Sequence, residues 1–223
     1  MSEARVPAPS LAHIKSIGII AAIGDTCMFE RVPDSRFEWI APPDASFLEI
    51  SDWNLDDEVA AEVTDVLTQH YTVQDIAIEH QDFDTWTWDT LRRDIRELPV
   101  PVVPVDAYLL VLRDWRADEI GRTDHQLGGL GLYRRDLGAG KERLGVFASY
   151  RVVLMDAENG NILASQPALM PGNKLPWLPA APSLWPRTQN DLTDAQRREL
   201  QTGFLKLVDE TLAPALQRMG LTH

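Results

Sequence analysis

Cysteine is almost absent from the sequence, and this scarcity limits the structures that the chain can form. The single residue Cys27 excludes an intramolecular disulfide and a structural zinc site built from cysteines. One cysteine fits a reducing compartment, and its apolar surroundings predict a small core side chain.

Positive charge is also scarce, because 21 Lys and Arg stand against 34 Asp and Glu and give a formal net charge of -13 at pH 7. A charge of this sign repels phosphate backbones and anionic lipids unless a local basic patch outweighs it. The densest basic groups are the pairs Arg92–Arg93, Arg134–Arg135 and Arg197–Arg198, and each pair lies near acidic residues. We therefore expect no basic patch and no nucleic-acid partner.

The sequence contains no apolar run long enough to span a bilayer. The run Ile17–Ile23 is much shorter than the roughly 20 apolar residues that a transmembrane helix needs, so it predicts a buried strand. Cys27 follows Gly24-Asp25-Thr26, and the aspartate fits poorly with a lipidation signal. We expect a cytoplasmic protein if the sequence is complete, and a periplasmic or envelope protein if a signal peptide has been removed from it.

What the sequence does have is the composition of an ordinary globular domain, with 44% hydrophobic and 25% charged residues over 223 positions. A chain of this length can bury one sizeable core, so a second domain is not required. We predict a flexible N-terminal arm at residues 1–12, followed by a single domain at residues 13–223. Its expected fold class is α/β (α+β), a mixed β-sheet flanked by helices.

Strand and helix patterns alternate along the predicted domain. Apolar or alternating runs predict strands at residues 17–23, 27–32, 47–50, 72–78, 107–112, 130–134, 144–155 and 162–165. Helical periodicity predicts helices at residues 55–70, at 88–98 and from 193 onwards, the last of which Pro214 should kink or end. Asn54 is the expected N-cap of the first helix, and Thr193 with Gln196 has capping-box spacing before the last. Asn159-Gly160 predicts a tight hairpin turn.

Two short stretches resemble a known group of bacterial envelope proteins. The run Asp106-Ala107-Tyr108 opens an apolar strand, and the residues from Asp156 to Gly160 turn the chain between two further strands. This order resembles the amino-terminal domain of the translocation protein TolB and its relatives among curli-secretion and penicillin-binding-protein-activator lipoproteins. The resemblance implies a mixed sheet with helices packed on it, which serves as an interaction or assembly module of bacterial type. The chain departs from the group because it has no lipobox and carries a long insert before its last helix, and no functional residue carries across.

The insert, residues 167–190, is the most informative segment for function. It contains six prolines and a set of large apolar side chains, namely Leu175, Trp177, Leu178, Leu184 and Trp185. Connections longer than about 12–15 residues without regular structure tend to be functional or disordered, and the tryptophans argue against disorder. One interpretation is a preorganised surface for a protein partner or for self-association. The simpler interpretation is a segment that wraps over its own domain and covers a sheet edge.

Other motifs give weaker signals. The acidic loop at residues 79–84 contains His80, Asp82 and Asp84, but a metal site there needs a further ligand, and a solvated loop with a helix cap is simpler. The glycines of Gly128–Gly131 and Gly138–Lys141 lack a following helix start that would orient amides toward a phosphate, so both predict turns. We therefore predict no catalytic residue, no metal and no cofactor.

Three functions stay open on the sequence alone. The first is a non-enzymatic interaction or assembly module, which the TolB resemblance and the insert both favour. The second is a metal-dependent hydrolase that uses the acidic loop. The third is a small-ligand-binding protein with a pocket beside Trp177 and Trp185.

Overall fold

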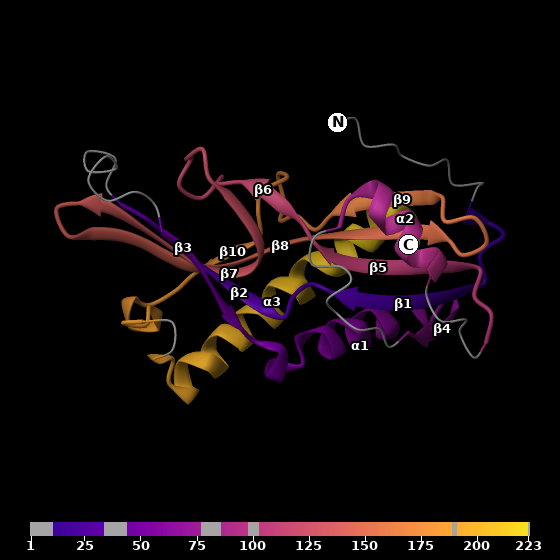
Figure 1. Cartoon of the computed structure of the whole chain (residues 1–223), viewed down its shortest axis with the longest axis horizontal. Coiled ribbons are helices and arrows are strands. Elements are labelled where there is room, and N and C mark those ends of the chain that lie inside the picture. The colour runs from indigo at the N-terminus through magenta and orange to yellow at the C-terminus, as the bar shows by residue number, and fades with distance from the viewer. Residues whose placement is uncertain (1–10, 34–43, 77–85, 98–102, 189–190, 223) are drawn as a thin grey trace.

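The computed structural model describes residues 11–33, 44–76, 86–97, 103–188 and 191–222. These residues form one curled mixed β-sheet with helices packed on it, which confirms the expected fold class (Figure 1). The strands are β1 (Ser16–Ala22), β2 (Thr26–Val32), β3 (Asp44–Glu49), β4 (Thr72–Asp75), β5 (Ala107–Arg113), β6 (Trp115–Ala117), β7 (Gln126–Gly138), β8 (Lys141–Asp156), β9 (Ile162–Pro167) and β10 (Trp177–Pro179). The helices are α1 (Leu55–Leu67), α2 (Trp88–Glu97) and α3 (Asp194–Met219), with short 3-10 turns η2 (Ser51–Trp53) and η4 (Pro182–Leu184).

The main path across the sheet has the order β3-β2-β7-β8-β5-β1-β4. β1 is parallel to β4 and β5, and β2 is parallel to β7, whereas β8 is antiparallel to both of its neighbours on this path. β5 is buried at every position from Ala107 to Arg113. Its continuous apolar sequence is the pattern of a central strand that is covered on both faces.

The long strand β8 joins two halves of the sheet. Its N-terminal half pairs with β7 and β10, and its C-terminal half pairs with β5 and β9. In Figure 1 the ends of β7 and β8 reach far to one side of the molecule, whereas β1, β5 and β9 lie at the other. The hairpin of β7 and β8 therefore extends beyond the part of the sheet that the helices cover.

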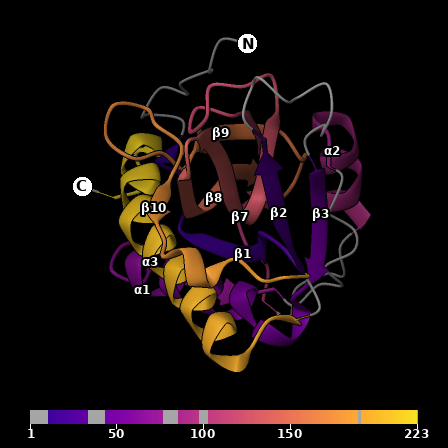
Figure 2. The ribbon, with the colours of Figure 1, turned by 90° about the vertical axis from the view of Figure 1, so that its left-hand side faces the viewer.

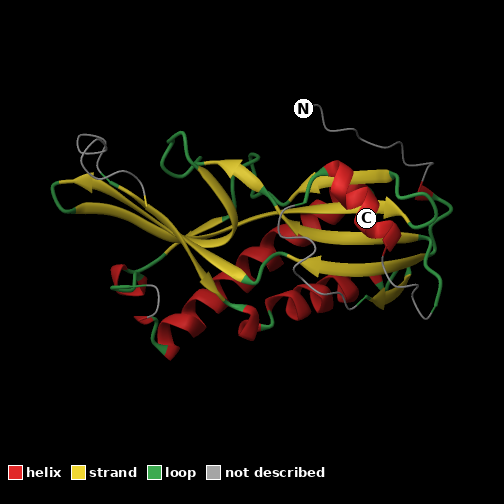
Figure 3. Ribbon diagram, in the orientation of Figure 1, coloured by secondary structure: helices red, strands yellow, loops and turns green. Residues whose placement is uncertain are grey.

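The three helices pack on the sheet (Figures 2 and 3) and contribute to two hydrophobic clusters. α1 and α3 lie on one face of the sheet, where Val63 and Phe204 join the main core around β5 and β8. α2 covers the opposite face, where Leu91 and Ile95 form a second cluster. A third, smaller cluster around Phe147 packs beneath the β7–β8 hairpin.

Two helix features match the sequence prediction only in part. Asn54 is the N-cap residue of α1, as expected, but it has a left-handed φ of 52° and its side chain makes no capping hydrogen bond. The acidic residues of the first turn favour this helix start through the helix dipole. Pro214 lies inside α3, and the helix continues to Met219 because Leu212 and Leu216 on either side of it are both fully buried.

One glycine stretch also differs from its prediction. β7 begins at Gln126, so Gly128–Gly131 lies within a strand and does not form the expected turn. The reason is close packing, since a Cβ on Gly131 would lie 2.3 Å from Cζ of Phe147. The expected turn at Gly138–Lys141 is confirmed, because it connects β7 to β8.

Other local predictions are confirmed. Thr193 and Gln196 form the full capping box at the start of α3. Asn159 and Gly160 turn the chain between β8 and β9, with Gly160 at a φ of 69°. The acidic loop with His80, Asp82 and Asp84 lies outside the described residues.

The described residues contain neither a cluster of metal ligands nor a helix that could span a membrane. Within the ranges given above, no group of three or more His, Cys, Asp and Glu side chains is placed to hold a metal ion. No helix of the described chain is long and apolar enough to cross a membrane.

Candidate functional site

The insert at residues 167–190 returns along β8. Its backbone continues the sheet, because Ala148 donates a hydrogen bond to the Pro176 carbonyl over 3.1 Å and Ala180 donates to the Leu144 carbonyl over 3.0 Å. Between these two bonds, Trp177 of β10 pairs with Phe147 of β8. The segment that looked structureless in the sequence thus supplies a short edge strand beside the β7–β8 hairpin.

The expected binding residues of the insert occupy two different environments. Leu184 is buried in the main core, and Leu178 and Trp185 pack against that core. Trp185 meets Phe29 edge to face, with ring centroids 5.9 Å apart. Leu175 and Trp177 instead join the smaller cluster beneath the hairpin.

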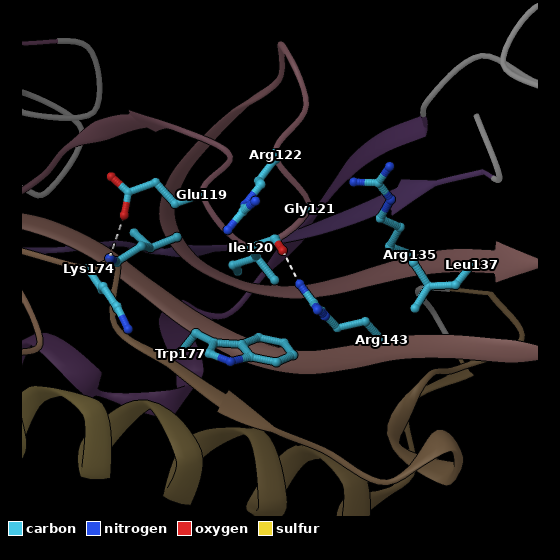
Figure 4. Close-up of a pocket in the computed structure, with 10 residues that line it drawn as sticks. Glu119, Ile120, Gly121, Arg122, Arg135, Leu137, Arg143, Lys174 and Trp177 are labelled. Atoms are coloured by element: carbon cyan, nitrogen blue, oxygen red, sulfur yellow. Dashed lines mark hydrogen bonds between the residues drawn. The ribbon is translucent and has the colours of Figure 1, made fainter.

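Leu175 and Trp177 also line an open cleft with a volume of about 810 Å³ (Figure 4). The segment after β6, the end of β7 and the start of β8 supply the remaining walls, and the insert adds one more residue. These further lining residues are Glu119, Ile120, Gly121, Arg122, Arg135, Leu137, Arg143 and Lys174. The volume lies within the range of roughly 300–1,000 Å³ that is typical of small-molecule sites.

Four of the lining side chains are cationic, namely Arg122, Arg135, Arg143 and Lys174. Among the residues that the structure describes, none of these four forms an ion pair with a carboxylate. Other arginines of this half of the sheet are paired, such as Arg134 with Glu142 at 2.8 Å. Unpaired cations that share one cleft repel one another, and an anion bound among them would relieve that repulsion.

Arg135 and Arg143 are brought together by strand pairing. They are direct partners in the antiparallel register of β7 and β8. Like charges at directly opposite positions destabilise a pair of strands, so this pairing is unfavourable in the absence of a ligand.

The carboxylate of Glu119 also lines the cleft, but it already has two partners. Its Oε1 lies 3.2 Å from Nη2 of Arg116, and its Oε2 accepts a hydrogen bond from the Leu175 amide over 3.1 Å. The second contact ties the insert to the segment after β6. Glu119 therefore adds one carboxylate to the wall of a cleft that contains four cations.

A buried carboxylate holds that segment in place. Asp118 is only 2% exposed, and it accepts hydrogen bonds from the Gly121 amide at 2.7 Å, the Thr123 hydroxyl at 2.7 Å and the Tyr133 hydroxyl at 2.8 Å. Burial raises the pKa of the Tyr133 phenol, Asp118 raises it further, and Arg135 opposes both. The phenol thus stays protonated and donates to Asp118.

Close packing around Gly121 gives the segment its shape. A Cβ at this position would lie 1.9 Å from Oη of Tyr133 and 2.6 Å from Oδ2 of Asp118, so only glycine fits. The next residue, Arg122, has a left-handed φ of 56°, a conformation that non-glycine residues adopt rarely and at a cost. The surrounding hydrogen bonds hold this strained residue at the edge of the cleft.

The cationic cleft corrects the expectation that the chain has no basic patch. Only Arg135 belongs to one of the basic pairs of the sequence, and the other three cations come from separate segments. One signal was available, because the turn at Gly138–Lys141 sets the register that places Arg135 opposite Arg143. Arg122 and Lys174 reach the cleft only through tertiary packing.

Comparison with known proteins adds a distant likeness of fold. No family model matches the sequence, and no curated protein matches it significantly. A crystal structure of a Xanthomonas campestris protein of the DUF330 family aligns over 93% of this chain and 85% of its own, with a TM-score of 0.40 and 11% identity. A neuraminyllactose-binding hemagglutinin homologue of Helicobacter pylori aligns over 99% and 94% of the two chains, with a TM-score of 0.31 and 9% identity. These values carry no argument about function and do not confirm a TolB-like fold, so the TolB resemblance stays a prediction.

Proposed function

We propose that the protein is a non-enzymatic binding module whose small ligand carries negative charge and binds in the cationic cleft. The observation that carries this proposal is the convergence of four cations without described ion-pair partners, in a chain with a net charge of -13. In such an acidic chain, the unpaired cations give the cleft a positive local potential that concentrates anions from solution.

The lining groups are suited to holding a ligand. Guanidinium and ammonium groups donate charge-assisted hydrogen bonds to phosphate, sulfonate or carboxylate oxygens. The remaining lining residues are mostly apolar, and the Glu119 carboxylate is engaged with Arg116 and Leu175. Such a set of groups orients an anion and requires no chemical step.

Preorganisation supports the same proposal. The hydrogen bonds to Asp118 hold the segment from Glu119 to Arg122, and Arg143 donates a hydrogen bond to the Ile120 carbonyl. A site whose walls are already in place loses little conformational entropy on binding.

Calorimetric titration with citrate at low ionic strength tests the proposal. The test variant combines Arg122→Gln with Lys174→Gln, because both side chains are exposed and neither has a described hydrogen bond within the protein. The control variant combines Arg198→Gln with Lys206→Gln on α3, which changes the net charge equally at an exposed place outside the cleft lining.

We expect citrate to bind the native chain and the control alike, and to bind the cleft variant at least about tenfold more weakly, because two charge-assisted contacts are lost. Binding should also weaken with added salt. Equal affinity in the two variants, or no binding of citrate to the native chain, would contradict the proposal.

Assembly with a protein partner or self-association, which the sequence also predicts, is a separate expectation. Light scattering on the native chain and on a Trp177→Ala, Trp185→Ala double variant tests it. A native oligomer that becomes a folded monomer in the double variant would place the insert at an interface between copies of this chain.

A further inference from the structure

The floor of the cleft is the indole of Trp177, a group that binding of a bare anion does not require. The ring lies against the backbone of β8, since a Cβ on Gly145 would be 2.2 Å from Cζ3 and 2.6 Å from Cε3 of the tryptophan. Only glycine permits this approach, so the sequence of β8 accommodates the ring at this place. Trp177 is half-buried, which leaves part of its surface open to the cleft.

Cationic groups flank the indole. Figure 4 shows the ring between the side chains of Lys174 and Arg143, below the segment that carries Ile120. The hydrogen bond from Arg143 to the Ile120 carbonyl holds this guanidinium beside the ring. The cleft therefore offers a flat aromatic surface and fixed positive charge next to each other.

We infer that the ligand is a planar aromatic anion, whose ring stacks on the Trp177 indole while its phosphate, sulfonate or carboxylate group meets Arg143 and the neighbouring cations. This inference rests on the proposed function, because it names the class of anion that the cationic cleft binds. Stacking on an aromatic side chain tolerates many ring types, so the class is defined by flatness and charge.

The size and lining of the cleft support an aromatic ligand over a bare anion. A volume of about 810 Å³ exceeds what a single charged group fills, and Ile120, Leu137 and Leu175 add apolar surface around the indole. A bare anion would leave this apolar surface in water, whereas a ring would cover part of it. A flexible chain could cover the same surface but would lose more conformational entropy than a rigid ring.

The charge of the cleft selects among aromatic ligands. A neutral ring would add no counter-charge to the opposed pair of Arg135 and Arg143, and a cationic ring would add to their repulsion. An anionic ring removes the repulsion and gains the stacking contact.

Three probes separate the ring from the charge. Anilinonaphthalene sulfonate carries both a ring system and a sulfonate. Phenylnaphthylamine carries the same rings without the sulfonate, and citrate carries charge without a ring. Each is titrated against the native chain, and displacement of the bound sulfonate probe by citrate shows whether the two share one site.

Two substitutions test the floor, and a third is the control. Trp177→Leu removes the aromatic surface, and Trp177→Phe keeps a flat ring at the same place. The control, Trp115→Leu, removes a tryptophan of β6 that is 47% exposed and does not line the cleft. Circular dichroism of each variant confirms that it is folded before titration.

We expect one sulfonate probe per chain, bound about tenfold more tightly than phenylnaphthylamine and displaced by citrate. Trp177→Leu should weaken the sulfonate probe about tenfold and change citrate binding little, whereas Trp177→Phe and Trp115→Leu should change both affinities by less than about threefold.

Two results would overturn the inference, and they differ from failure of the proposed function. If the native chain binds citrate but Trp177→Leu binds the sulfonate probe as tightly as the native chain does, the indole is not a stacking surface and only the aromatic assignment fails. Citrate binding without any binding of the sulfonate probe leads to the same conclusion. If citrate itself does not bind, or binds the cleft and control charge variants equally, the proposed function fails. If Trp177→Leu does not fold, folded Trp177→Phe takes its place. Sulfonate binding within about threefold of the native chain, and about tenfold tighter than phenylnaphthylamine binding, would support the inference, whereas phenylnaphthylamine bound as tightly as the sulfonate probe would overturn it.

Discussion

Arg135 and Arg143 are directly opposite one another on β7 and β8, so two positive charges occupy a position where strands usually carry a matched pair. The Nε of Arg135 is also buried without a hydrogen-bond partner. Replacing this arginine by a neutral side chain should therefore relieve repulsion in the ligand-free protein. We expect Arg135→Gln to raise the free energy of unfolding by about 0.2–1 kcal/mol while it weakens the binding of citrate.

Urea unfolding and citrate titration on the same variant check both signs. Arg134→Gln is the matched control, because Arg134 is the next residue along β7 but is paired with Glu142 at 2.8 Å and lies 5.8 Å from the centroid of the Trp185 ring. Arg134→Gln should therefore lower the free energy of unfolding. An Arg135→Gln variant that is less stable than the native chain would show that the opposed arginines are not a source of strain.

Gly121 offers a test of how the wall of the cleft is held. Gly121→Ala would place a methyl group 1.9 Å from Oη of Tyr133, so the hydroxyl must leave Asp118 or the segment must move. We expect a loss of stability of about 1–3 kcal/mol and weaker binding in the cleft. Tyr133→Phe removes only the hydroxyl donor and should lower the free energy of unfolding by less than Gly121→Ala does. A Gly121→Ala variant as stable as the native chain would contradict the close packing around Gly121.

The order of most strands and helices could be predicted from the sequence because these elements depend on local patterns, whereas the short strands β6 and β10 were not predicted. The apolar run of β5, the capping box of Thr193 with Gln196 and the turn at Asn159-Gly160 are all confirmed. Local rules failed where tertiary packing decides the outcome. Gly128–Gly131 lies in a strand because the ring of Phe147 packs against it, and Pro214 stays within α3 because the helix is buried on both sides of it.

The cleft could be predicted only in part. Leu175 and Trp177 are predicted as binding residues because large apolar side chains in a proline-rich insert are expected to pack against a surface, and both line the cleft. Arg122 and Lys174 are far apart in the sequence, and they line one cleft only because the insert returns along β8. The left-handed φ of Arg122 and the close packing of Gly121 have no signature in the sequence.

Buried thiol and phenol groups, among them Cys27 and Tyr150, make stability depend on pH in the alkaline range. Burial raises the pKa of the Cys27 thiol and of the Tyr150 phenol, whose hydroxyl lies 2.7 Å from Oγ1 of Thr211. In the unfolded chain the two groups ionise near pH 8.5 and pH 10, at about their ordinary values. The folded chain then holds more protons than the unfolded chain, so stability is complete below about pH 8.5 and falls as the pH rises.

The expected slope above these values is up to about 1.4 kcal/mol per pH unit for each group. Urea unfolding at a series of pH values between about 7 and 11 measures it. Cys27→Ala should remove the part of the slope that begins near pH 8.5, at about the ordinary thiol value. Tyr150→Phe should reduce the part that begins at about pH 10, to which the buried Tyr133 phenol also contributes. Slopes that are the same in both variants as in the native chain would contradict the burial of these groups.

Substitutions of Trp177 and Trp185 should differ in their effects on stability and on ligand affinity, although both residues lie in the same insert. Trp185 packs against Phe29 and the main core, so Trp185→Ala should lower the free energy of unfolding by about 1–3 kcal/mol and change ligand affinity little. Trp177 is half-buried at the floor of the cleft, so Trp177→Ala should cost less stability and weaken binding of the sulfonate probe by about tenfold. Urea unfolding and probe titration on both single variants measure the four quantities. Equal losses of stability and affinity in the two variants would mean that the insert acts as one unit, and that the division between a core contact and a ligand contact is wrong.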